Sequence, residues 1–237
     1  MEQFNSFLNE IAGVTLTSSQ IADFNKFENL LVEWNEAFNL TSITSSVEIK
    51  IKHFVDSLTC LKVLSIKENF SMVDVGTGAG FPGIPLKIVM PWIKLTLVES
   101  SQKKSGFCRT VVDQLHLADT DVVTMRAEDL GRNVKYRGHF DWAVARAVAE
   151  LPVLAEYLLP LLKIGGKALA MKGAQIEKEV DNSQNAIEVL GGSFHNQIKF
   201  ALPQGYGERS LIVIKKVNPT PNNYPRRAGL PSKKPVM

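Results

Sequence analysis

One stretch constrains the fold more than any other: a short apolar run followed at once by a cluster of glycines. The run at residues 72–75 reads MVDV, which is typical of a strand buried on both faces of a sheet. The glycines that follow allow a sharp turn and let a ligand approach the backbone closely; they are Gly76, Gly78, Gly80 and Gly83. Pro82, which lies among them, suits the first turn of a helix. Strand, glycine turn and helix together predict the phosphate- or nucleoside-binding corner of a doubly wound α/β sheet.

The glycines fit two ligand-binding patterns. Gly78, Gly80 and Gly83 match G-x-G-x-x-G, the pattern of dinucleotide-binding folds. Asp74 followed by Gly76, Gly78 and Gly80 matches D-x-G-x-G-x-G, which resembles the first motif of S-adenosylmethionine-dependent methyltransferases. A third interpretation is a structural turn that binds nothing. The strand before the glycines and the helix after them favour a turn that binds a ligand.

Composition indicates an ordinary globular protein of the cytosol. Hydrophobic residues make up 45% and charged residues 22% of the 237 residues, enough to bury one sizeable core. No apolar run reaches the roughly 18 residues that a membrane span requires, and the first ten residues have no basic n-region of a secretory signal. Cys60 and Cys108 lie far apart among apolar neighbours, so we expect reduced, buried thiols and no metal site.

Charge is concentrated at the end of the chain. Residues 218–237 contain four basic residues, no acid and five of the eleven prolines, so they contribute +4 to a net charge of +3, and the remainder sums to −1. We expect this tail to lie extended without building a core. A basic extended tail suits a phosphate-rich partner, although it could equally be a solubilising end. The predicted division is a helical extension at 1–62, an α/β domain at 63–217 and the basic, proline-rich tail at 218–237.

The first sixty residues have the apolar spacing of helices. Residues 17–20 (TSSQ) and 45–48 (SSVE) each resemble a capping box at a helix start. His53 and Asp56 fall on one face of the second of these helices. Two interpretations stay open for the pair: a local structural hydrogen bond, or a wall of the site that binds the target.

Strand and helix patterns alternate through the rest of the chain until two strands come together at its end. The expected strands cover residues 95–98, 122–124, 140–145, 167–171, 194–200 and 210–215, and helices are expected at 151–162 and 176–190. Gly165 and Gly166 are expected to stop the first of these helices. This order predicts an α/β sheet that is mostly parallel and closes with an antiparallel hairpin.

Polar residues stand where several of these strands end. Glu99 follows the second strand, where a carboxylate can accept hydrogen bonds from both ribose hydroxyls. Ala127 and Glu128 follow the third strand, where a backbone N–H and a carboxylate can recognise the adenine edge. Arg146 ends the fourth strand, in the crevice where ligands bind in open α/β sheets, and we expect it to contact cofactor, base or phosphate. Lys172 ends the fifth strand.

A family resemblance sharpens this interpretation. The run DVGTGAGFPGIPL at residues 74–86 is its centre, and it is supported by NEAFNLTS (35–42), HFVDS (53–57), ARA (145–147), MKG (171–173), GERSL (207–211) and PRRAGLPSKK (225–234). Together these runs resemble the bacterial 16S ribosomal RNA guanine-N7 methyltransferases, also called glucose-inhibited division protein B. The resemblance implies the class I methyltransferase fold, Rossmann-like with an N-terminal helical extension.

The resemblance also implies a cofactor, a substrate and contact residues. The cofactor is S-adenosylmethionine, and the substrate is a guanine N7 of 16S ribosomal RNA, alone or in the small ribosomal subunit. The implied cofactor contacts are Gly76, Gly78, Phe81, Glu99, Ala127, Glu128 and Arg146. Arg146 and, more weakly, Lys172 are expected to position the target nucleotide. No catalytic acid or base and no metal is expected, because guanine N7 carries a lone pair and no proton.

Two functions of other classes compete with this one. An NAD-dependent oxidoreductase could use the same glycines, but it would need hydride-transfer residues and a substrate domain that the sequence does not offer. A non-catalytic RNA-binding factor would be expected to have lost its cofactor loop, whereas the glycines and Glu99 are all present.

Overall fold

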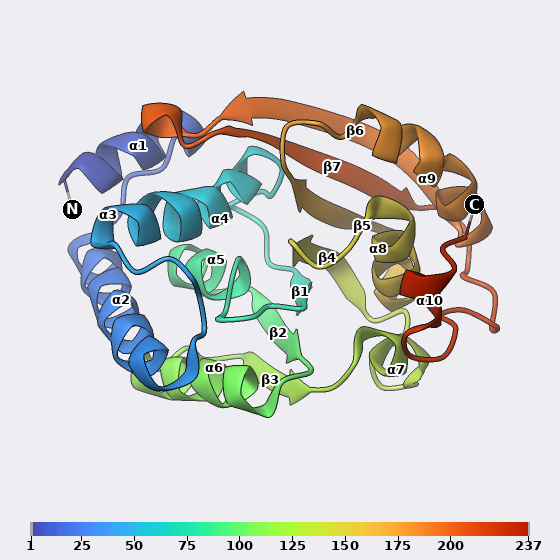
Figure 1. The fold of residues 1–237 in the computed structure, drawn as a ribbon, viewed down its shortest axis with the longest axis horizontal. Coiled ribbons are helices and arrows are strands. Elements are labelled where there is room, and N and C mark those ends of the chain that lie inside the picture. Colours follow the sequence, from blue (N-terminus) through green and yellow to red (C-terminus); the bar gives the residue numbers. More distant parts are fainter. Residues whose placement is uncertain (1, 237) are drawn as a thin grey trace.

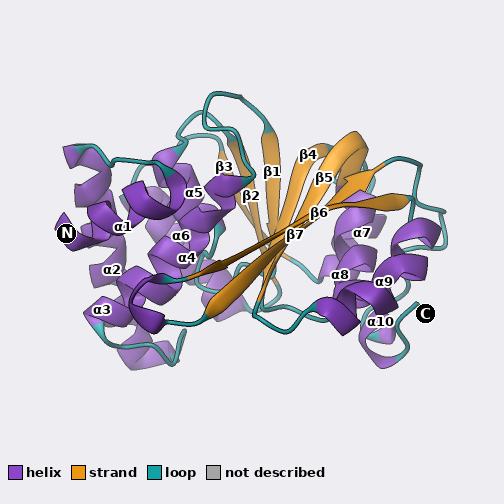
Figure 2. Ribbon diagram, turned by 90° about the horizontal axis from the view of Figure 1, so that it is seen from above, coloured by secondary structure: helices purple, strands orange, loops and turns teal. Residues whose placement is uncertain are grey.

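The computed structural model describes residues 2–236, which form an α/β/α sandwich. Figure 2 shows the twisted sheet between two helical layers, with α1–α6 on one side and α7–α10 on the other. The N-terminus and the C-terminus lie at opposite ends of the molecule (Figure 1). Among the described residues, no helix is long and apolar enough to cross a membrane.

Residues 2–236 contain a seven-stranded sheet in the order β3-β2-β1-β4-β5-β7-β6. The strands are β1 (Ser71–Val75), β2 (Lys94–Glu99), β3 (Thr120–Thr124), β4 (Phe140–Arg146), β5 (Leu162–Lys172), β6 (Gly192–Ala201) and β7 (Glu208–Lys216). The first five strands pair in parallel, whereas β7 runs antiparallel to both β5 and β6. The predicted parallel sheet with an antiparallel C-terminal hairpin is therefore confirmed.

The sheet is buried on both faces, and its apolar residues alternate between two cores. In β1, Met72 packs in the core on the side of α1–α6, whereas Val73 and Val75 pack in the core on the side of α7–α10. In β7, Val213 and Ile214 divide in the same way. Because side chains alternate along a strand, a continuous apolar run fills both cores at once, as expected of a strand covered on both faces.

The N-terminal helices form an outer layer over α5 (Gly83–Val89) and α6 (Gln102–Gln114). They are α1 (Glu2–Ala12), α2 (Ser18–Phe38) and a continuous helical run made of α3 (Ser46–Glu48), the π-helix η1 (Ile49–Val55), α4 (Asp56–Leu58) and the 3-10 helix η2 (Thr59–Lys62). The capping box predicted at Thr17 and Gln20 is present. The one predicted at Ser45 is wrong: the Ser45 side chain makes no capping bond, and the Glu48 side chain pairs with Lys52.

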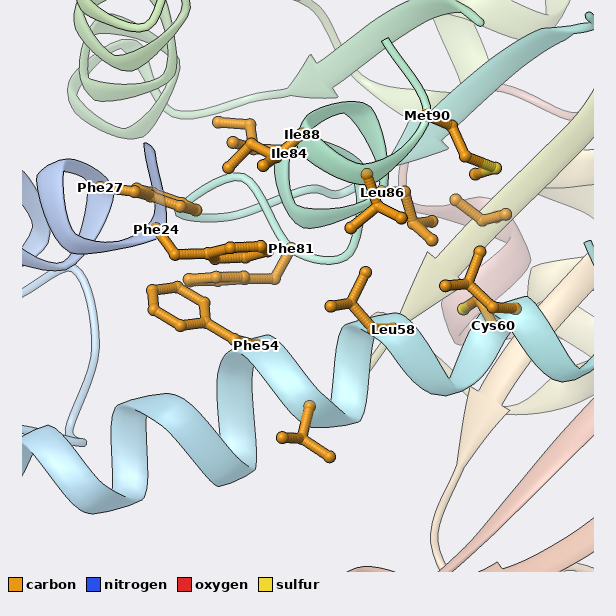
Figure 3. Packing of buried hydrophobic residues seen from close by; sticks show 14 of the residues in the cluster. Phe24, Phe27, Phe54, Leu58, Cys60, Phe81, Ile84, Leu86, Ile88 and Met90 are labelled. Carbon is orange, nitrogen blue, oxygen red and sulfur yellow. The ribbon is translucent and has the colours of Figure 1, made fainter. Parts of the chain in front are cut away.

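Aromatic rings join this outer layer to the glycine turn. Figure 3 shows Phe24, Phe27 and Phe54 from the N-terminal helices gathered around Phe81 of the turn. The Phe27 and Phe81 rings are stacked with their centroids 5.2 Å apart. Offset stacking and the burial of large rings both stabilise such a cluster. The N-terminal helices are thus packed directly onto the loop that follows β1.

The other helical layer contains α7 (Ala127–Arg132), α8 (Leu151–Leu158), the 3-10 turn η3 (Leu159–Leu161), α9 (Glu177–Val189) and α10 (Leu230–Lys233). One sequence prediction fails here. Gly165 and Gly166 lie inside β5, which begins at Leu162 and not at residue 167. The register of β5 against β4 shifts across these residues, and Gly165 has φ +89, so the glycines allow an irregular strand to continue.

The C-terminal segment differs from its prediction as well. Residues 218–236 pack along α7 and α8 instead of extending from the molecule, and they include the short helix α10 (Figure 1). Pro225 and Pro231 are buried. Tyr224 and Val236 contact the core beneath α8. Side chains far away in the sequence hold this segment in place. The composition of the segment alone therefore does not reveal that it is packed.

Candidate cofactor and substrate cavities

Two cavities open at the carboxyl ends of the parallel strands, where the strand order reverses between β1 and β4. Ligands in open α/β sheets bind at this switch point. Arg146 and Ala147 line one cavity and Val148 lines the other, so the end of β4 separates them. Ala147 itself has φ +55, a strained conformation of the kind that clusters at functional sites.

The first cavity, here called the acidic cavity, has a volume of about 400 Å³, within the range of small-molecule sites. Two carboxylates, Glu99 and Glu128, face it. Its full lining consists of Val75, Gly76, Val98, Glu99, Ser100, Met125, Arg126, Ala127, Glu128, Val148, Tyr157, Ala228, Gly229 and Ser232. The lining therefore comes from the ends of β1, β2, β3 and β4, from α7 and α8, and from the C-terminal segment.

Asp74 holds the glycine turn in shape from beneath. Its Oδ2 accepts hydrogen bonds from Thr77 Oγ1 at 2.6 Å and from the Gly83 backbone N–H at 2.8 Å. The side chain is fully buried. Burial raises the pKa of Asp74 to about 6, although these two hydrogen bonds oppose the rise. The partners of this buried carboxylate thus belong to the turn that follows it.

Gly76 is the glycine whose lack of a side chain shapes the acidic cavity. It has φ +70, and a Cβ at this position would lie 2.6 Å from Val148 Cγ2. Any larger residue would therefore push Val148, another lining residue, out of place. The lack of a side chain at Gly76 thus makes room for Val148, and Gly76 itself lines the cavity.

Glu99 is fixed by the backbone of both neighbouring loops. Its Oε1 accepts from the Ser101 N–H at 2.8 Å, and its Oε2 accepts from the Gly78 N–H at 3.1 Å. The carboxylate is only 9% exposed, and that exposure is toward the acidic cavity. Carboxylate oxygens can each accept more than one hydrogen bond. Glu99 is therefore a preorganised acceptor for a pair of hydroxyl groups.

Glu128 occupies the opposite end of the same cavity, in the first turn of α7. Its Oε1 accepts from the Gly229 N–H at 2.8 Å and from the Tyr157 hydroxyl at 3.3 Å. Its Oε2 makes no hydrogen bond to any other described residue. Since the side chain is 4% exposed and lines the cavity, that oxygen is placed to accept a hydrogen bond from a ligand.

The second cavity, here called the basic cavity, has a volume of about 410 Å³ and lies on the other side of the end of β4. Four basic side chains line it against one carboxylate. The lining consists of Ile43, Lys52, His53, Asp56, Arg146, Ala147, Met171, Lys172, Gly173 and Arg209. Lys52 and Lys172 are paired with Glu48 and Glu179 outside the lining, and the two arginines share Asp56, so the group keeps one net positive charge. Guanidinium and ammonium groups at a concave surface suit an anionic partner such as a nucleic acid.

Asp56 organises the basic cavity because two arginines share it. Its Oδ2 pairs with Arg146 at 3.0 Å, and its Oδ1 pairs with the Arg209 Nε at 3.0 Å. Arg146 also donates to the Lys52 carbonyl at 3.0 Å, and its guanidinium lies 5.1 Å from the centre of the Phe81 ring. These contacts fix the guanidinium groups in position before any ligand arrives.

His53 is a neutral member of the same network. Arg146 donates to its Nδ1 at 3.3 Å, so the ring proton is on Nε2, which donates to Thr41 Oγ1 at 3.0 Å. Burial, followed by the positive charge of Arg146, lowers the pKa of His53 from 6.5 to about 3. Among the described residues the side chains of His53 and Asp56 share no hydrogen bond, although the Asp56 backbone N–H donates to the His53 carbonyl as part of the helix. Both line the basic cavity, so the position agrees with the second of the two sequence interpretations.

The structure brings some of the predicted site residues together and separates others. Gly76, Glu99, Ala127 and Glu128 all line the acidic cavity. The remaining predicted residues lie elsewhere: Arg146 and Lys172 line the basic cavity, and Gly78 and Phe81 line neither. The seven cofactor contacts, which are all of these residues except Lys172, stay predictions.

Lys172 and Phe81 are both engaged within the protein. Lys172 is paired with Glu179 at 2.5 Å and donates to the Ala149 carbonyl at 2.6 Å. Phe81 is 4% exposed and stacks on the His53 ring with a centroid distance of 4.4 Å. Phe81 therefore supports the wall of the basic cavity from behind.

Sequence reasoning missed several residues of both cavities. Tyr157, Gly229 and Ser232 line the acidic cavity, and Arg209 lines the basic one. Arg209 lies in the run GERSL that carries the resemblance, so its place in that run is a signal that could have marked it. Gly229 and Ser232 lie in the run PRRAGLPSKK that also carries the resemblance, whereas Tyr157 lies in none of the quoted runs.

Comparison with known proteins identifies relatives along nearly the whole chain. A family model described as "GidB: rRNA small subunit methyltransferase G" matches residues 20–211. The "Ribosomal RNA small subunit methyltransferase G" of Leuconostoc citreum is 48% identical over 238 residues, which is 100% of this chain and 99% of that protein. The protein of the same name from Alkaliphilus metalliredigens is 47% identical over 224 residues, or 94% of each chain.

Solved structures of lower identity share the fold. The structure of M. jannaschii TYW2 in complex with AdoMet has a TM-score of 0.50 at 14% identity, with 63% of this chain and 70% of that chain covered. A variant of the 16S rRNA (adenine(1408)-N(1))-methyltransferase from Catenulisporales acidiphilia has a TM-score of 0.53 at 15% identity, with 63% and 89% covered. The predicted class I methyltransferase fold is confirmed.

Proposed function

The chain belongs to the GidB family of rRNA small subunit methyltransferase G proteins, and from this premise we propose that it transfers a methyl group from S-adenosylmethionine to guanine N7 of 16S ribosomal RNA. It is an S-adenosylmethionine-dependent rRNA methyltransferase by family. The observation that supports the finer assignment is the pair of cavities that meet at residues 146–148, one lined by carboxylates and the other by basic groups.

The acidic cavity fits the cofactor. Glu99 would accept hydrogen bonds from both ribose hydroxyls, and Gly76, which lines the same cavity, would border the ligand at the glycine turn. At the other end, the free Oε2 of Glu128 would accept a hydrogen bond from the exocyclic amine of adenine, next to the backbone of Ala127. When bound, the cofactor supplies an electrophilic methyl group on a sulfonium sulfur.

The basic cavity would hold the target nucleotide. Arg146 and Arg209 are both fixed by Asp56, and their guanidinium groups suit guanine O6 or a backbone phosphate. Lys172 would add a positive charge at the rim of the same cavity. Neutral His53 keeps this wall free of a titrating charge at physiological pH. A base held here would meet the acidic cavity at the end of β4.

The chemistry needs alignment more than proton transfer. Guanine N7 has an in-plane lone pair and no proton, so no residue has to act as a general base. The task of the chain is then to hold the base at a near-attack distance and to exclude water. We assign no catalytic acid or base, and the described residues contain no cluster of metal ligands. Among these groups Arg146 carries the positioning role.

The cellular setting follows from the substrate. We place the protein in the cytoplasm, where it would act on 16S ribosomal RNA or on the small ribosomal subunit. Residues 63–217 would supply most of the cofactor cavity, which the C-terminal segment completes, whereas the helical extension at 1–62 would supply part of the basic cavity through Lys52, His53 and Asp56. The two earlier alternatives, an NAD-dependent oxidoreductase and a non-catalytic RNA-binding factor, gain no support from the antiparallel β7 or from the intact acidic cavity.

Calorimetry tests the cofactor. We expect S-adenosylhomocysteine, the product of the cofactor, to bind and NAD not to bind. Tight binding of NAD would overturn the assignment, and a failure to bind S-adenosylhomocysteine would remove the cofactor from the acidic cavity.

The modified atom is tested with small-subunit particles that lack the methyl group. Incubation with methyl-labelled cofactor should place the label on a guanine of 16S ribosomal RNA, and the same RNA containing 7-deazaguanine, in which carbon replaces N7, should take up none. Equal labelling of the 7-deazaguanine RNA would contradict N7 as the acceptor. Arg146→Gln should lose transfer and still bind S-adenosylhomocysteine, whereas unchanged transfer would remove Arg146 from the site.

A further inference from the structure

The C-terminal segment, residues 218–236, ends its path at the acidic cavity. After β7 the chain crosses to α7 and α8, and α10 lies beside these two helices in Figure 1. Ala228, Gly229 and Ser232 form part of the cavity wall. The family model ends at residue 211, so this segment lies outside the part of the chain that the model matches.

A buried ion pair anchors the segment. Arg226 donates from Nε to both oxygens of Glu156, at 3.0 and 3.1 Å, and from NH2 to Oε2 at 2.6 Å. The Arg226 backbone N–H also donates to Glu156 Oε1 at 2.7 Å. Glu156 is fully buried on α8, so this carboxylate has little contact with water once the segment is in place. Such an arrangement fixes both the position and the direction of the segment.

Two arginines of the α/β domain hold the backbone just before this anchor. Arg137 donates to the carbonyls of Thr220 at 2.8 Å and Tyr224 at 2.7 Å, and Arg132 donates to the carbonyl of Pro225 at 2.8 Å. Of the basic residues in the segment, Arg226 forms an ion pair within the protein. Residues 220–226, which precede the cavity-lining residues, are therefore held against the α/β domain.

The same segment orients Glu128. The Gly229 N–H donates to Glu128 Oε1 at 2.8 Å, and Ser232 Oγ is 3.0 Å from the hydroxyl of Tyr157, which itself lies 3.3 Å from that oxygen. One carboxylate oxygen is thus occupied by the segment and by Tyr157. The other oxygen, Oε2, is left for a ligand in the cavity. A detached segment would leave Glu128 without this orientation.

We propose that the C-terminal segment is a structural part of the cofactor site: residues 228–232 wall the adenine end of the acidic cavity and fix Glu128 for adenine recognition. This inference rests on the proposed function, because it assumes that the adenosyl group occupies the acidic cavity. It assigns the segment to the cofactor and not to the RNA. Its basic composition is then secondary to the contacts of Arg226 and Gly229.

Matched tryptophan substitutions test the segment. In the full-length protein, Ala228→Trp places a large side chain on the cavity wall, whereas Arg227→Trp places the same side chain on the exposed neighbour that lines neither cavity. The readout is the affinity for S-adenosylhomocysteine, measured by calorimetry. We expect Ala228→Trp to weaken binding at least tenfold and Arg227→Trp to change it less than twofold. Ser232→Trp against Lys233→Trp forms a second pair with the same expectation.

The thermal unfolding midpoint of each variant serves as the folding control. If Ala228→Trp and Ser232→Trp bind S-adenosylhomocysteine as the unmodified protein does, the segment is not part of the site and the inference is overturned. The same holds if the four variants keep cofactor affinity and lose only RNA binding, which would make the segment an RNA-binding arm. If the unmodified protein itself fails to bind S-adenosylhomocysteine, the proposed function fails first.

Discussion

At the scale of single residues, Glu99 is the sharpest test of the acidic cavity. We expect Glu99→Ala to weaken S-adenosylhomocysteine binding about 100-fold or more, because two hydrogen bonds from the ribose to a charged acceptor are lost at about 1.5–3 kcal/mol each. Calorimetry measures the change directly. Glu188→Ala, which removes an exposed carboxylate on α9, is the matched control and should bind as the unmodified protein does. Equal affinity in both variants would contradict the assignment.

His53 gives a prediction for pH. Burial and Arg146 lower the pKa of His53 from 6.5 to about 3, so its contribution to folding stability is complete above pH 6.5 and is lost as the pH falls toward 3. At pH 5 the loss is about 2 kcal/mol. Asp74 acts in the opposite sense: its pKa rises from 3.8 to about 6, so its contribution grows as the pH falls through 6 toward 3.8. In the unmodified protein the two contributions therefore partly cancel, and its stability alone does not reveal that of His53.

A comparison with His53→Gln isolates the contribution of His53 to the pH dependence of stability. Denaturant unfolding at pH 7 and at pH 5 should show that acidification costs the unmodified protein about 1–2 kcal/mol more than it costs His53→Gln. His195→Gln, at an exposed histidine, should respond to acid as the unmodified protein does. An identical response of His53→Gln and the unmodified protein would show that His53 is not neutral in the folded state.

At the scale of elements, the glycine turn offers a matched pair of substitutions. Gly76 and Gly78 both have positive φ, so alanine is strained at either position by about 1–2 kcal/mol. The surroundings differ: a Cβ on Gly76 would lie 2.6 Å from Val148 Cγ2, whereas a Cβ on Gly78 would meet nothing within 4 Å. We expect Gly76→Ala to lose more stability and more cofactor affinity than Gly78→Ala, as measured by denaturant unfolding and calorimetry. The reverse order would place the cofactor nearer Gly78.

The anchor of the C-terminal segment makes a second prediction at this scale. Arg226→Leu leaves the buried Glu156 without its partner, which is costly, so the segment should detach. Amide hydrogen exchange over residues 226–233 should become at least tenfold faster. Arg227→Leu should leave the exchange unchanged, and adding Glu156→Leu to Arg226→Leu should restore part of the protection. Unchanged exchange in Arg226→Leu would mean that the ion pair does not hold the segment.

The elements that the sequence predicts well are those whose signal is local. The strands carry continuous apolar runs, and the glycine turn is determined by residues 74–83 themselves. The predicted start of β5 was wrong, because the sequence pattern of Gly165 and Gly166 is typical of a helix stop. Only the pairing with β4 reveals that the strand continues through these glycines. Glu99 and Glu128, each predicted to follow a strand, line the same cavity, since parallel strands end at one edge of the sheet.

At the scale of the whole molecule, the sequence could not reveal the course of residues 218–236. Their anchors lie far away in the chain: Arg226 meets Glu156 across 70 residues, and Gly229 meets Glu128 across 101 residues. No periodicity links such partners, and the proline-rich composition suggests an unpacked tail. The separation of Arg146 from the acidic cavity has the same cause, because its partners Asp56 and Lys52 come from the N-terminal helices.

The two cavities predict that cofactor binding and RNA binding can be impaired separately. Arg209→Gln should lower the kcat/KM for RNA at least tenfold and leave the affinity for S-adenosylhomocysteine unchanged, because Arg209 lines only the basic cavity. Lys215→Gln, at an exposed basic residue on the same strand, controls for the loss of one positive charge. A variant of Arg209 that binds S-adenosylhomocysteine tenfold more weakly would show that the cavities are not independent.

The carboxylate that Arg146 and Arg209 share has a consequence for protein engineering. Asp56 belongs to the N-terminal helices, yet it clamps the end of β4 and the start of β7. A chimaera with a foreign recognition module in place of residues 1–62 would leave the guanidinium groups of Arg146 and Arg209 without their shared counter-ion. Retargeting this scaffold would therefore require the new module to supply a carboxylate at the position of Asp56, since Arg146 and Arg209 both remain on the sheet.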